Sequence, residues 1–123
     1  MKNIWKEKKF VKKIKFLNRN HAYKLYPSES WAILSTLTEC KNILDVGCGD
    51  GNKFKVLKKF NNKIKYTGID LNSELIKIAN KKYKDKNTQF FSMNINKDYK
   101  SIKKKKYDLI MGWAFFYCLE NYK

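Results

Sequence analysis

The chain has 123 residues, of which 43% are hydrophobic and 15% aromatic, which suffices for one globular domain with a core but not for two. No stretch approaches the roughly 20 uninterrupted apolar residues that span a bilayer, and the lysine-rich start lacks the apolar run of a secretory signal. We therefore expect a cytoplasmic protein without a membrane partner. The cysteines form no CxxC pair and His21 is the only histidine, which argues against a metal centre and favours reduced, structural cysteines.

The formal net charge of +17 admits a polyanion such as RNA as a partner, because clustered lysines neutralise phosphates. Arg19 is the sole arginine, however, whereas base readout and bidentate phosphate contacts usually use arginine. The joint excess of Lys, Asn and Ile is also what an AT-rich genome produces through codon bias. The charge therefore favours codon bias and solubility, with a functional basic surface as the alternative.

Residues 1–30 are predicted to form a basic, helical amino-terminal extension. Pro27 then interrupts the chain, and Ser28 or Ser30 can cap a second helix that leads into the main domain, residues 31–123. The first helix either packs on that domain or forms a lid over a ligand or an arm facing nucleic acid. Its apolar residues recur at spacings near three and four: Ile4, Phe10, Val11, Ile14 and Leu17.

From Asn42 onward, signals for strands and helices alternate along the chain. The helix 73–84 has Ser73 as its candidate cap. Helices placed between parallel strands predict an α/β fold with a doubly wound, mostly parallel sheet. The expected strands are 43–46, 65–69, 89–93 and 107–111, and the expected helices are 52–60 and 73–84.

Residues 47–51, here called the glycine turn, read Gly-Cys-Gly-Asp-Gly and lie where an open α/β sheet binds its ligand. A tight structural loop alone would also explain the glycines. The turn is neither the GxGxxG dinucleotide fingerprint nor a phosphate-binding loop. Asp45, inside the first strand, would repel a pyrophosphate but suits a ligand that carries an ammonium group and a sulfonium. Asp70, at the end of the next strand, stands where a carboxylate can accept hydrogen bonds from both ribose hydroxyls.

Four segments together resemble the motifs of class I S-adenosylmethionine-dependent methyltransferases, in the order of that family and over residues about 30 to 120. The segments are Ile43–Gly51, Tyr66–Asn72, Phe91–Ile95 and Tyr107–Leu119. This resemblance implies a Rossmann-like fold, S-adenosyl-L-methionine as the cofactor and an enzyme that methylates a small or medium-sized acceptor. Such a transfer is an in-line displacement, for which the protein mainly orients the reactants and excludes water. No residue is identifiable as a catalytic base.

The resemblance also implies roles for single residues. Asp45 and the backbone of the glycine turn would hold the methionine part, Asp70 the ribose, and Leu71 would cover one adenine face. Asn94 stands where the family usually has an acid that accepts a hydrogen bond from the adenine amino group, and an amide oxygen can still accept that bond without charge. The complete predicted set is Asp45, Gly47, Cys48, Gly49, Asp70, Leu71, Asn94, Ile95 and Trp113.

Aromatic residues near both ends admit two interpretations. Trp113 and Tyr117 either close the core or line the cofactor and acceptor pocket, where an aromatic face stabilises a sulfonium. His21, Tyr23 and Tyr26 could fold over the cofactor as a lid, although a lone histidine is more often structural.

The chain ends at Lys123, after the fourth predicted strand, whereas the class I fold generally has seven strands. We therefore expect a fragment of a longer frame, a broken gene, or a half-domain completed by another chain, with an open sheet edge that favours self-association or a partner supplying strands. The predicted function is a methyltransferase with an unidentified acceptor. The alternative is a non-catalytic basic module for RNA or another polyanion, or an inactive fragment that retains the cofactor-binding half.

Overall fold

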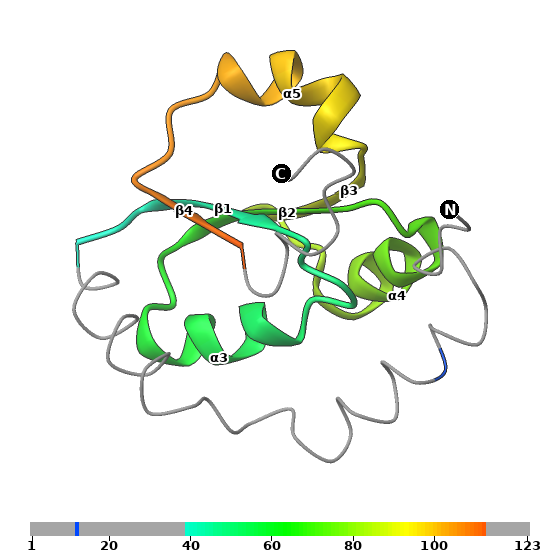
Figure 1. Ribbon diagram of the computed structural model, residues 1–123. Coiled ribbons are helices and arrows are strands. Elements are labelled where there is room, and N and C mark those ends of the chain that lie inside the picture. The colour runs from blue at the N-terminus through cyan, green and yellow to red at the C-terminus, as the bar shows by residue number, and fades with distance from the viewer. Residues whose placement is uncertain (1–11, 13–38, 113–123) are drawn as a thin grey trace.

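The computed structural model describes Lys12 and residues 39–112 (Figure 1). The predicted amino-terminal helices lie outside these residues. The described elements follow the chain in the order β1 (Asn42–Val46), α3 (Asn52–Phe60), β2 (Lys65–Asp70), α4 (Ser73–Tyr83), β3 (Thr88–Ser92), α5 (Ile95–Lys103) and β4 (Leu109–Met111).

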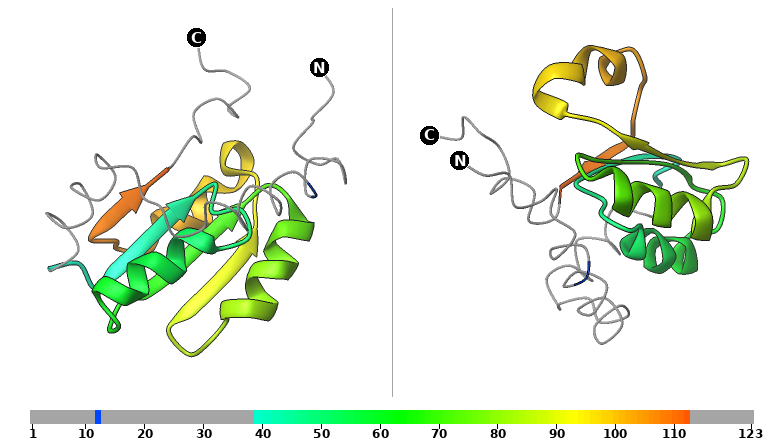
Figure 2. Two further views of the ribbon diagram at one scale, coloured as in Figure 1. Left: turned by 90° about the horizontal axis from the view of Figure 1, so that it is seen from below. Right: turned by 90° about the vertical axis from the view of Figure 1, so that its right-hand side faces the viewer.

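The strands form one sheet in the order β3-β2-β1-β4, and every neighbouring pair is parallel. Helices α3 and α4 cover one face of this sheet, and α5 lies on the other (Figure 2). The predicted doubly wound α/β fold is therefore confirmed. The strand order changes direction at β1, between β2 and β4, and ligands of open α/β sheets bind at the carboxyl ends of the strands at such a switch point.

Apolar side chains from β1 enter both layers of the molecule, as expected for a central strand of a parallel sheet covered on both sides. Ile43 belongs to the cluster beneath α3 and α4, here called the α3/α4 cluster, whereas Leu44 and Val46 belong to the cluster beneath α5, called the α5 cluster. The α3/α4 cluster centres on aromatic rings. The Tyr66 ring lies 4.9 Å from the Phe54 ring and 5.6 Å from the Phe90 ring, measured between centroids.

Asparagine side chains begin two of the helices. Asn72 caps α4 by accepting hydrogen bonds from the backbone N–H groups of Glu74 and Leu75, at 3.0 and 3.2 Å. The prediction that Ser73 is this cap is wrong, because Ser73 is already the first helical residue. Helix α5, which the sequence analysis did not predict, is capped by Asn94 and contains no buried residue.

The last described strand, β4, begins at Leu109 rather than at residue 107. The side chain of Asp108 accepts hydrogen bonds from the backbone N–H groups of Lys41 and Asn42, both at 2.8 Å. These bonds connect the residue before β4 to the start of β1. They also hold the pKa of Asp108 below its usual range. Within the described part of the chain, no helix has both the length and the apolar character needed to cross a bilayer.

Candidate functional site

The glycine turn connects the carboxyl end of β1 to the start of α3 and is fastened to β2. The backbone N–H groups of Gly47 and Cys48 both donate to the carbonyl oxygen of Ile69, at 2.8 and 3.1 Å. Gly47, Gly49 and Gly51 have φ angles of 78°, 57° and 80°, in the left-handed region that side chains with a Cβ rarely adopt. The three glycines are therefore required by the shape of the turn.

Asp70, at the end of β2, holds two separate pieces of backbone. One carboxylate oxygen accepts from the N–H of Gly49 at 2.9 Å, and the other accepts from the N–H of Asn72 at 2.8 Å. Burial raises the pKa of Asp70, and these two bonds oppose that rise. Because each carboxylate oxygen can accept two hydrogen bonds, Asp70 can organise the turn and still accept bonds from a ligand.

Asp45 lies beneath the turn rather than on its surface, since only 1% of the residue is exposed. Its carboxylate accepts a hydrogen bond of 2.5 Å from the hydroxyl of Tyr66. Burial raises the pKa of Asp45 to about 7; the Tyr66 bond and the charge of Lys53 lower it, and the charge of Asp70 raises it. The described contact of Asp45 is thus with Tyr66, which the sequence analysis did not single out, and a contact with a ligand stays a prediction.

Cys48 fits beneath the turn because the facing position on β2 has no side chain. A Cβ added at Gly68 would lie 2.8 Å from the Cys48 sulfur and 2.7 Å from a ring carbon of Phe90. Burial raises the pKa of the Cys48 thiol well above its usual range, and the charges of nearby carboxylates raise it further. Cys48 and Cys40 are both free and buried, which fits the structural role predicted for them.

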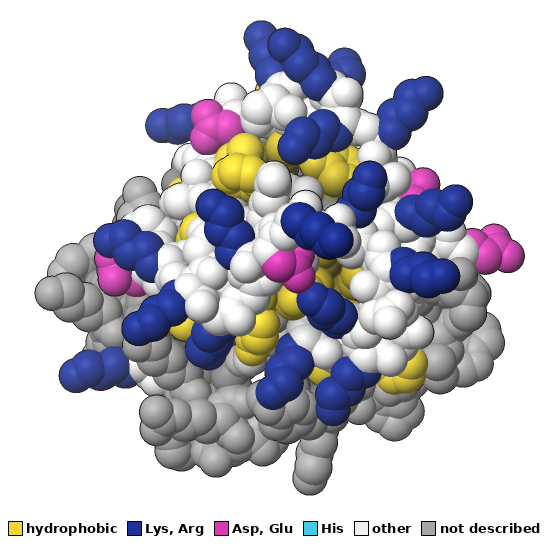
Figure 3. Space-filling view, turned by 180° about the vertical axis from the view of Figure 1, so that it is seen from behind, with side chains coloured by type: hydrophobic (Ala, Val, Ile, Leu, Met, Phe, Trp, Pro, Cys, Tyr) yellow, Lys and Arg dark blue, Asp and Glu magenta, His cyan; other side chains and the backbone are white. Residues whose placement is uncertain are grey.

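Three carboxylates surround the turn in a chain whose formal charge is +17. Asp45, Asp50 and Asp70 all raise the pKa of Cys48 through their charge. Asp50 is 2% exposed and lies 3.4 Å from the Nζ of Lys82, and the charge of Lys53 acts on Asp45. Elsewhere lysine side chains spread over the visible surface with few carboxylates among them (Figure 3). Asp45, Asp50 and Asp70 thus form an acidic cluster around the turn of a basic protein.

The segment after β3 approaches the same end of the sheet. The N–H of Met93 donates to the carbonyl oxygen of Asp70 at 2.9 Å. The side chain of Asn94 accepts from the N–H of Asn96 at 3.1 Å as the cap of α5, so its predicted contact with adenine stays a prediction. Ile95 is half-buried against the α5 cluster.

The structure therefore brings most of the predicted residues to the carboxyl ends of β1, β2 and β3. The residues placed there are Asp45, Gly47, Cys48, Gly49, Asp70, Leu71, Asn94 and Ile95. Five further candidates lie outside the described residues: Trp113, Tyr117, His21, Tyr23 and Tyr26.

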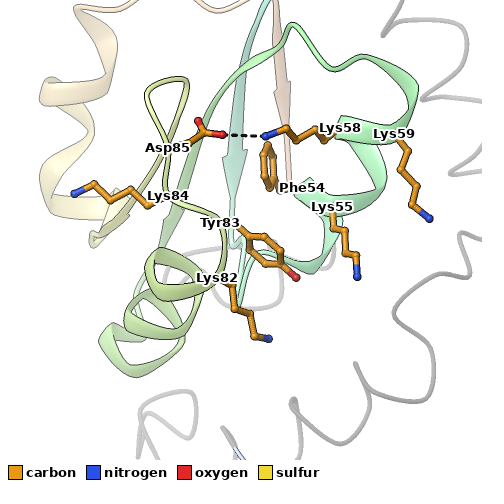
Figure 4. A pocket seen from close by; sticks show the side chains of 8 residues that line it. All are labelled: Phe54, Lys55, Lys58, Lys59, Lys82, Tyr83, Lys84 and Asp85. Carbon is orange, nitrogen blue, oxygen red and sulfur yellow. Dashed lines mark hydrogen bonds and ion pairs between the residues drawn. The ribbon is translucent and has the colours of Figure 1, made fainter.

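A cavity of about 470 Å³ lies between α3 and the end of α4 (Figure 4). Lys58 forms an ion pair with Asp85 at 2.9 Å and lies 5.3 Å from the centre of the Phe54 ring. This lysine-lined cavity was not predicted from the sequence, because its residues come from α3 and from the end of α4, which only the fold brings together. It is lined by Phe54, Lys55, Lys58, Lys59, Lys82, Tyr83, Lys84 and Asp85.

Comparison with protein families yields a match to a family described as a methyltransferase domain, over residues 43–123. The chain belongs to this family. The matched methyltransferase domain begins inside β1 and includes the glycine turn, Asp70 and Asn94. No curated protein sequence matches the chain.

Among solved structures, the chain is similar to the plantazolicin methyltransferase BpumL in complex with SAH, with 28% identity and a TM-score of 0.73 over 94% of this chain and 45% of that one. BpumL with a monoazolic desmethylPZN analog and SAH gives 27% identity and a TM-score of 0.75 over 98% and 48%. A putative S-adenosyl-L-methionine-dependent methyltransferase from Methanococcus maripaludis shares the fold, with 18% identity and a TM-score of 0.73 over 94% and 53%. The chain spans about half the length of these proteins.

Proposed function

We propose that the chain binds S-adenosylmethionine at the glycine turn and forms part of an enzyme that methylates an acceptor. The observation that carries this proposal is the acidic cluster formed by Asp45, Asp50 and Asp70 on a protein of charge +17. Nearby carboxylates favour a ligand with a sulfonium and an ammonium group and disfavour a pyrophosphate. The SAH bound in BpumL, which is similar over nearly the whole of this chain, supports the same ligand class.

The described residues fit the parts of this cofactor. The remaining lone pairs of Asp70 would accept hydrogen bonds from the ribose hydroxyls, and the backbone of the glycine turn would hold the methionine part. Leu71 and Ile95 would flank the adenine, whose amino group would donate to the Asn94 oxygen. When bound, the cofactor supplies an activated methyl group; the protein residues orient it and exclude water.

We further propose an acceptor that is a small or medium-sized organic molecule. BpumL has been solved with desmethylPZN analogs of several sizes. The similarity to BpumL is the sole support for this acceptor class. The aromatic residues Trp113 and Tyr117 stay candidates for lining the acceptor pocket.

Calorimetric titration of the full chain with S-adenosylhomocysteine (SAH) tests the cofactor site. We expect binding, and we expect Asp70→Asn to weaken it by about 10- to 100-fold, the usual scale for losing hydrogen bonds to a charged group. Asp85→Asn, which alters an exposed carboxylate of the lysine-lined cavity, is the matched control and should bind like the wild type. A cooperatively folded chain that fails to bind at millimolar SAH, or an Asp70→Asn variant of wild-type affinity, would refute the proposal.

A second candidate function is polyanion binding, and the lysine-lined cavity is the observation that favours it. Five lysines and one carboxylate line this cavity, and Figure 4 shows several of the lysines reaching out around its rim. Clustered lysines bind the phosphates of RNA by releasing counterions, so the affinity should fall steeply as salt rises. Many of these lysines also lie near helix carboxyl ends, where a positive charge stabilises the helix itself.

Filter binding of single-stranded RNA at several salt concentrations tests this second function. Lys58 and Lys82 are left unchanged, because their ion pairs join α3 to Asp85 and α4 to Asp50. If the cavity binds RNA, changing Lys55, Lys59 and Lys84 together to Gln should lower both the affinity and the salt slope. The same change at the exposed α5 residues Lys97, Lys100 and Lys103 is the control of equal charge. Equal losses in both triple variants would assign the binding to overall charge rather than to the cavity.

A further inference from the structure

The following inference rests on the proposed cofactor site. We propose that Tyr66 is a positioning residue for cofactor binding: its hydroxyl holds the Asp45 carboxylate beneath the glycine turn, so that binding of a cationic ligand is coupled to release of a proton from Asp45.

The geometry fixes both partners. The Tyr66 ring packs against the rings of Phe54 and Phe90, at centroid distances of 4.9 and 5.6 Å, and the residue is 1% exposed. On the sheet, Asp45 lies directly opposite Gly68, two residues after Tyr66 on β2. Residues two apart on a strand share a face, so the Tyr66 hydroxyl reaches the Asp45 carboxylate from a diagonal position, at 2.5 Å.

Asp45 also lies next to the glycine turn, the proposed ligand site, in sequence and in space. It precedes Gly47 by two residues, and its charge is felt by the Cys48 thiol inside the turn. A buried carboxylate in this position interacts strongly with any charge placed at the turn, because the surroundings contain little water to screen it. The hydrogen bond from Tyr66 thus positions the Asp45 carboxylate beneath the turn.

The groups that face Asp45 come from each neighbouring element. They are Tyr66 and Asp70 from β2, Lys53 from α3 and the Cys48 thiol from the turn, while β4 places the uncharged Met111 opposite it. With its pKa raised to about 7 by burial, Asp45 is partly protonated at neutral pH, and the Tyr66 hydroxyl opposes the rise by stabilising the ionised form.

The coupling has a defined sign. A cation at the turn favours ionised Asp45, so at pH values below the pKa of the free protein, binding must expel a proton and is weakened. Above that pKa, Asp45 is already ionised and the affinity reaches its plateau. Loss of the Tyr66 hydroxyl raises the Asp45 pKa further and moves the plateau to higher pH.

The test is the affinity for SAH, which retains the ammonium group, measured by calorimetry on the full chain from about pH 5.5 to 8.5. For the wild type we expect affinity to rise by up to about tenfold per pH unit below a midpoint near 7. Tyr66→Phe should move this midpoint to higher pH. Asp45→Asn should abolish this midpoint and leave the titrations of the ligand and of Asp70, whose pKa burial also raises.

Tyr83→Phe is the matched control. Tyr83 belongs to the same aromatic group, with its ring 5.8 Å from that of Phe54, but its hydroxyl lies 3.4 Å from the Asn52 side chain rather than at Asp45. Its loss can lower stability but should not move the midpoint. A pH profile identical in the wild type, Tyr66→Phe and Asp45→Asn would overturn the inference while leaving cofactor binding intact. Absence of SAH binding at every pH would instead refute the proposed function.

A second measurement does not depend on the folding of any variant. The side-chain carboxyl carbon of Asp45 can be followed by NMR as the wild-type chain is titrated with acid, with and without saturating SAH. We expect the midpoint of this titration to fall when SAH is bound. A midpoint that SAH leaves unchanged would overturn the coupling.

Discussion

The two faces of the β-sheet differ in how much they bury. Among residues 39–112, ten buried residues form the α3/α4 cluster beneath α3 and α4, whereas the α5 cluster contains three, and α5 itself contributes no buried residue. The Asp45–Tyr66 pair and Cys48 belong to the better-packed face. The α5 face contributes Asn94 and Ile95, at the start of a helix with little packing to hold it. The comparison indicates that the α3/α4 face supplies the rigidity of the site.

Truncation of one side chain on each face should show the largest difference. Phe54, 2% exposed, packs against Tyr66, Tyr83 and Phe90. Phe54→Ala should lower the free energy of unfolding by about 3–5 kcal/mol. Ile102→Ala, at a half-buried position on α5, should cost about 1 kcal/mol, since little area is lost. Urea unfolding followed by circular dichroism measures both; equal costs would contradict the asymmetry.

Asp45→Asn should raise stability at high pH. In the folded chain, burial raises the pKa of Asp45 to about 7, so between the pKa of the unfolded chain and about 7 the folded state binds more protons. The Asp45 contribution is complete at acid pH and is lost as pH rises through about 7. Because Asn cannot ionise but still accepts the Tyr66 bond, the rise of the Asp45 pKa from 3.8 to about 7 corresponds to an expected gain of about 4 kcal/mol at pH 8. Urea unfolding at about pH 5 and pH 8 measures it; no gain at the higher pH would contradict the assignment.

Gly68→Ala tests how tightly the turn is seated on the α3/α4 face. The new Cβ would lie 2.7 Å from Phe90 and 2.8 Å from the Cys48 sulfur, so we expect a cost of about 1–3 kcal/mol. Adding Cys48→Ala removes one of the two clashes and should recover part of this cost in a double-mutant cycle. Strictly additive effects would show that Cys48 and Gly68 are not in contact.

Loss of a helix cap should give the smallest effect. We expect this effect to stay local on the α5 face and to be global on the α3/α4 face. Asn94→Ala removes the cap of α5 and should cost about 1 kcal/mol, mostly as local opening of that helix. Asn72→Ala removes the cap of α4, which carries three buried residues, and should lower global stability instead. Native-state hydrogen exchange distinguishes the two; a global effect of Asn94→Ala would mean that α5 unfolds with the rest of the chain.

Much of this architecture could be predicted because apolar runs and polar intervals alternate clearly after Asn42. Helix 52–60 was predicted with the bounds observed for α3, and no end of β1, β2 or β3 differs from its predicted position by more than one residue. Helix α5 was missed because Ile95, Tyr99 and Ile102 are its only large apolar residues, among lysines and asparagines. With so little apolar surface, the pattern does not distinguish a helix from a loop.

The candidate site was less predictable than the fold. Glycines and acids could be placed at the strand ends from their spacing alone. The Tyr66–Asp45 bond could not, because it depends on the register of β1 against β2. The capping role of Asn72 had a local signal, an Asn directly before the predicted helix 73–84, although the cap was assigned to Ser73. The capping role of Asn94 had no such signal, because the helix that follows it was not predicted.

The most direct test of the central claim, that the glycine turn is the cofactor site, is a map of backbone amide shifts as ¹⁵N-labelled full chain is titrated with SAH. We predict that the largest shifts fall in the glycine turn, at Asp70 to Asn72 and at Asn94 and Ile95. Largest shifts around the lysine-lined cavity, or no shifts in a folded chain at millimolar SAH, would contradict the account.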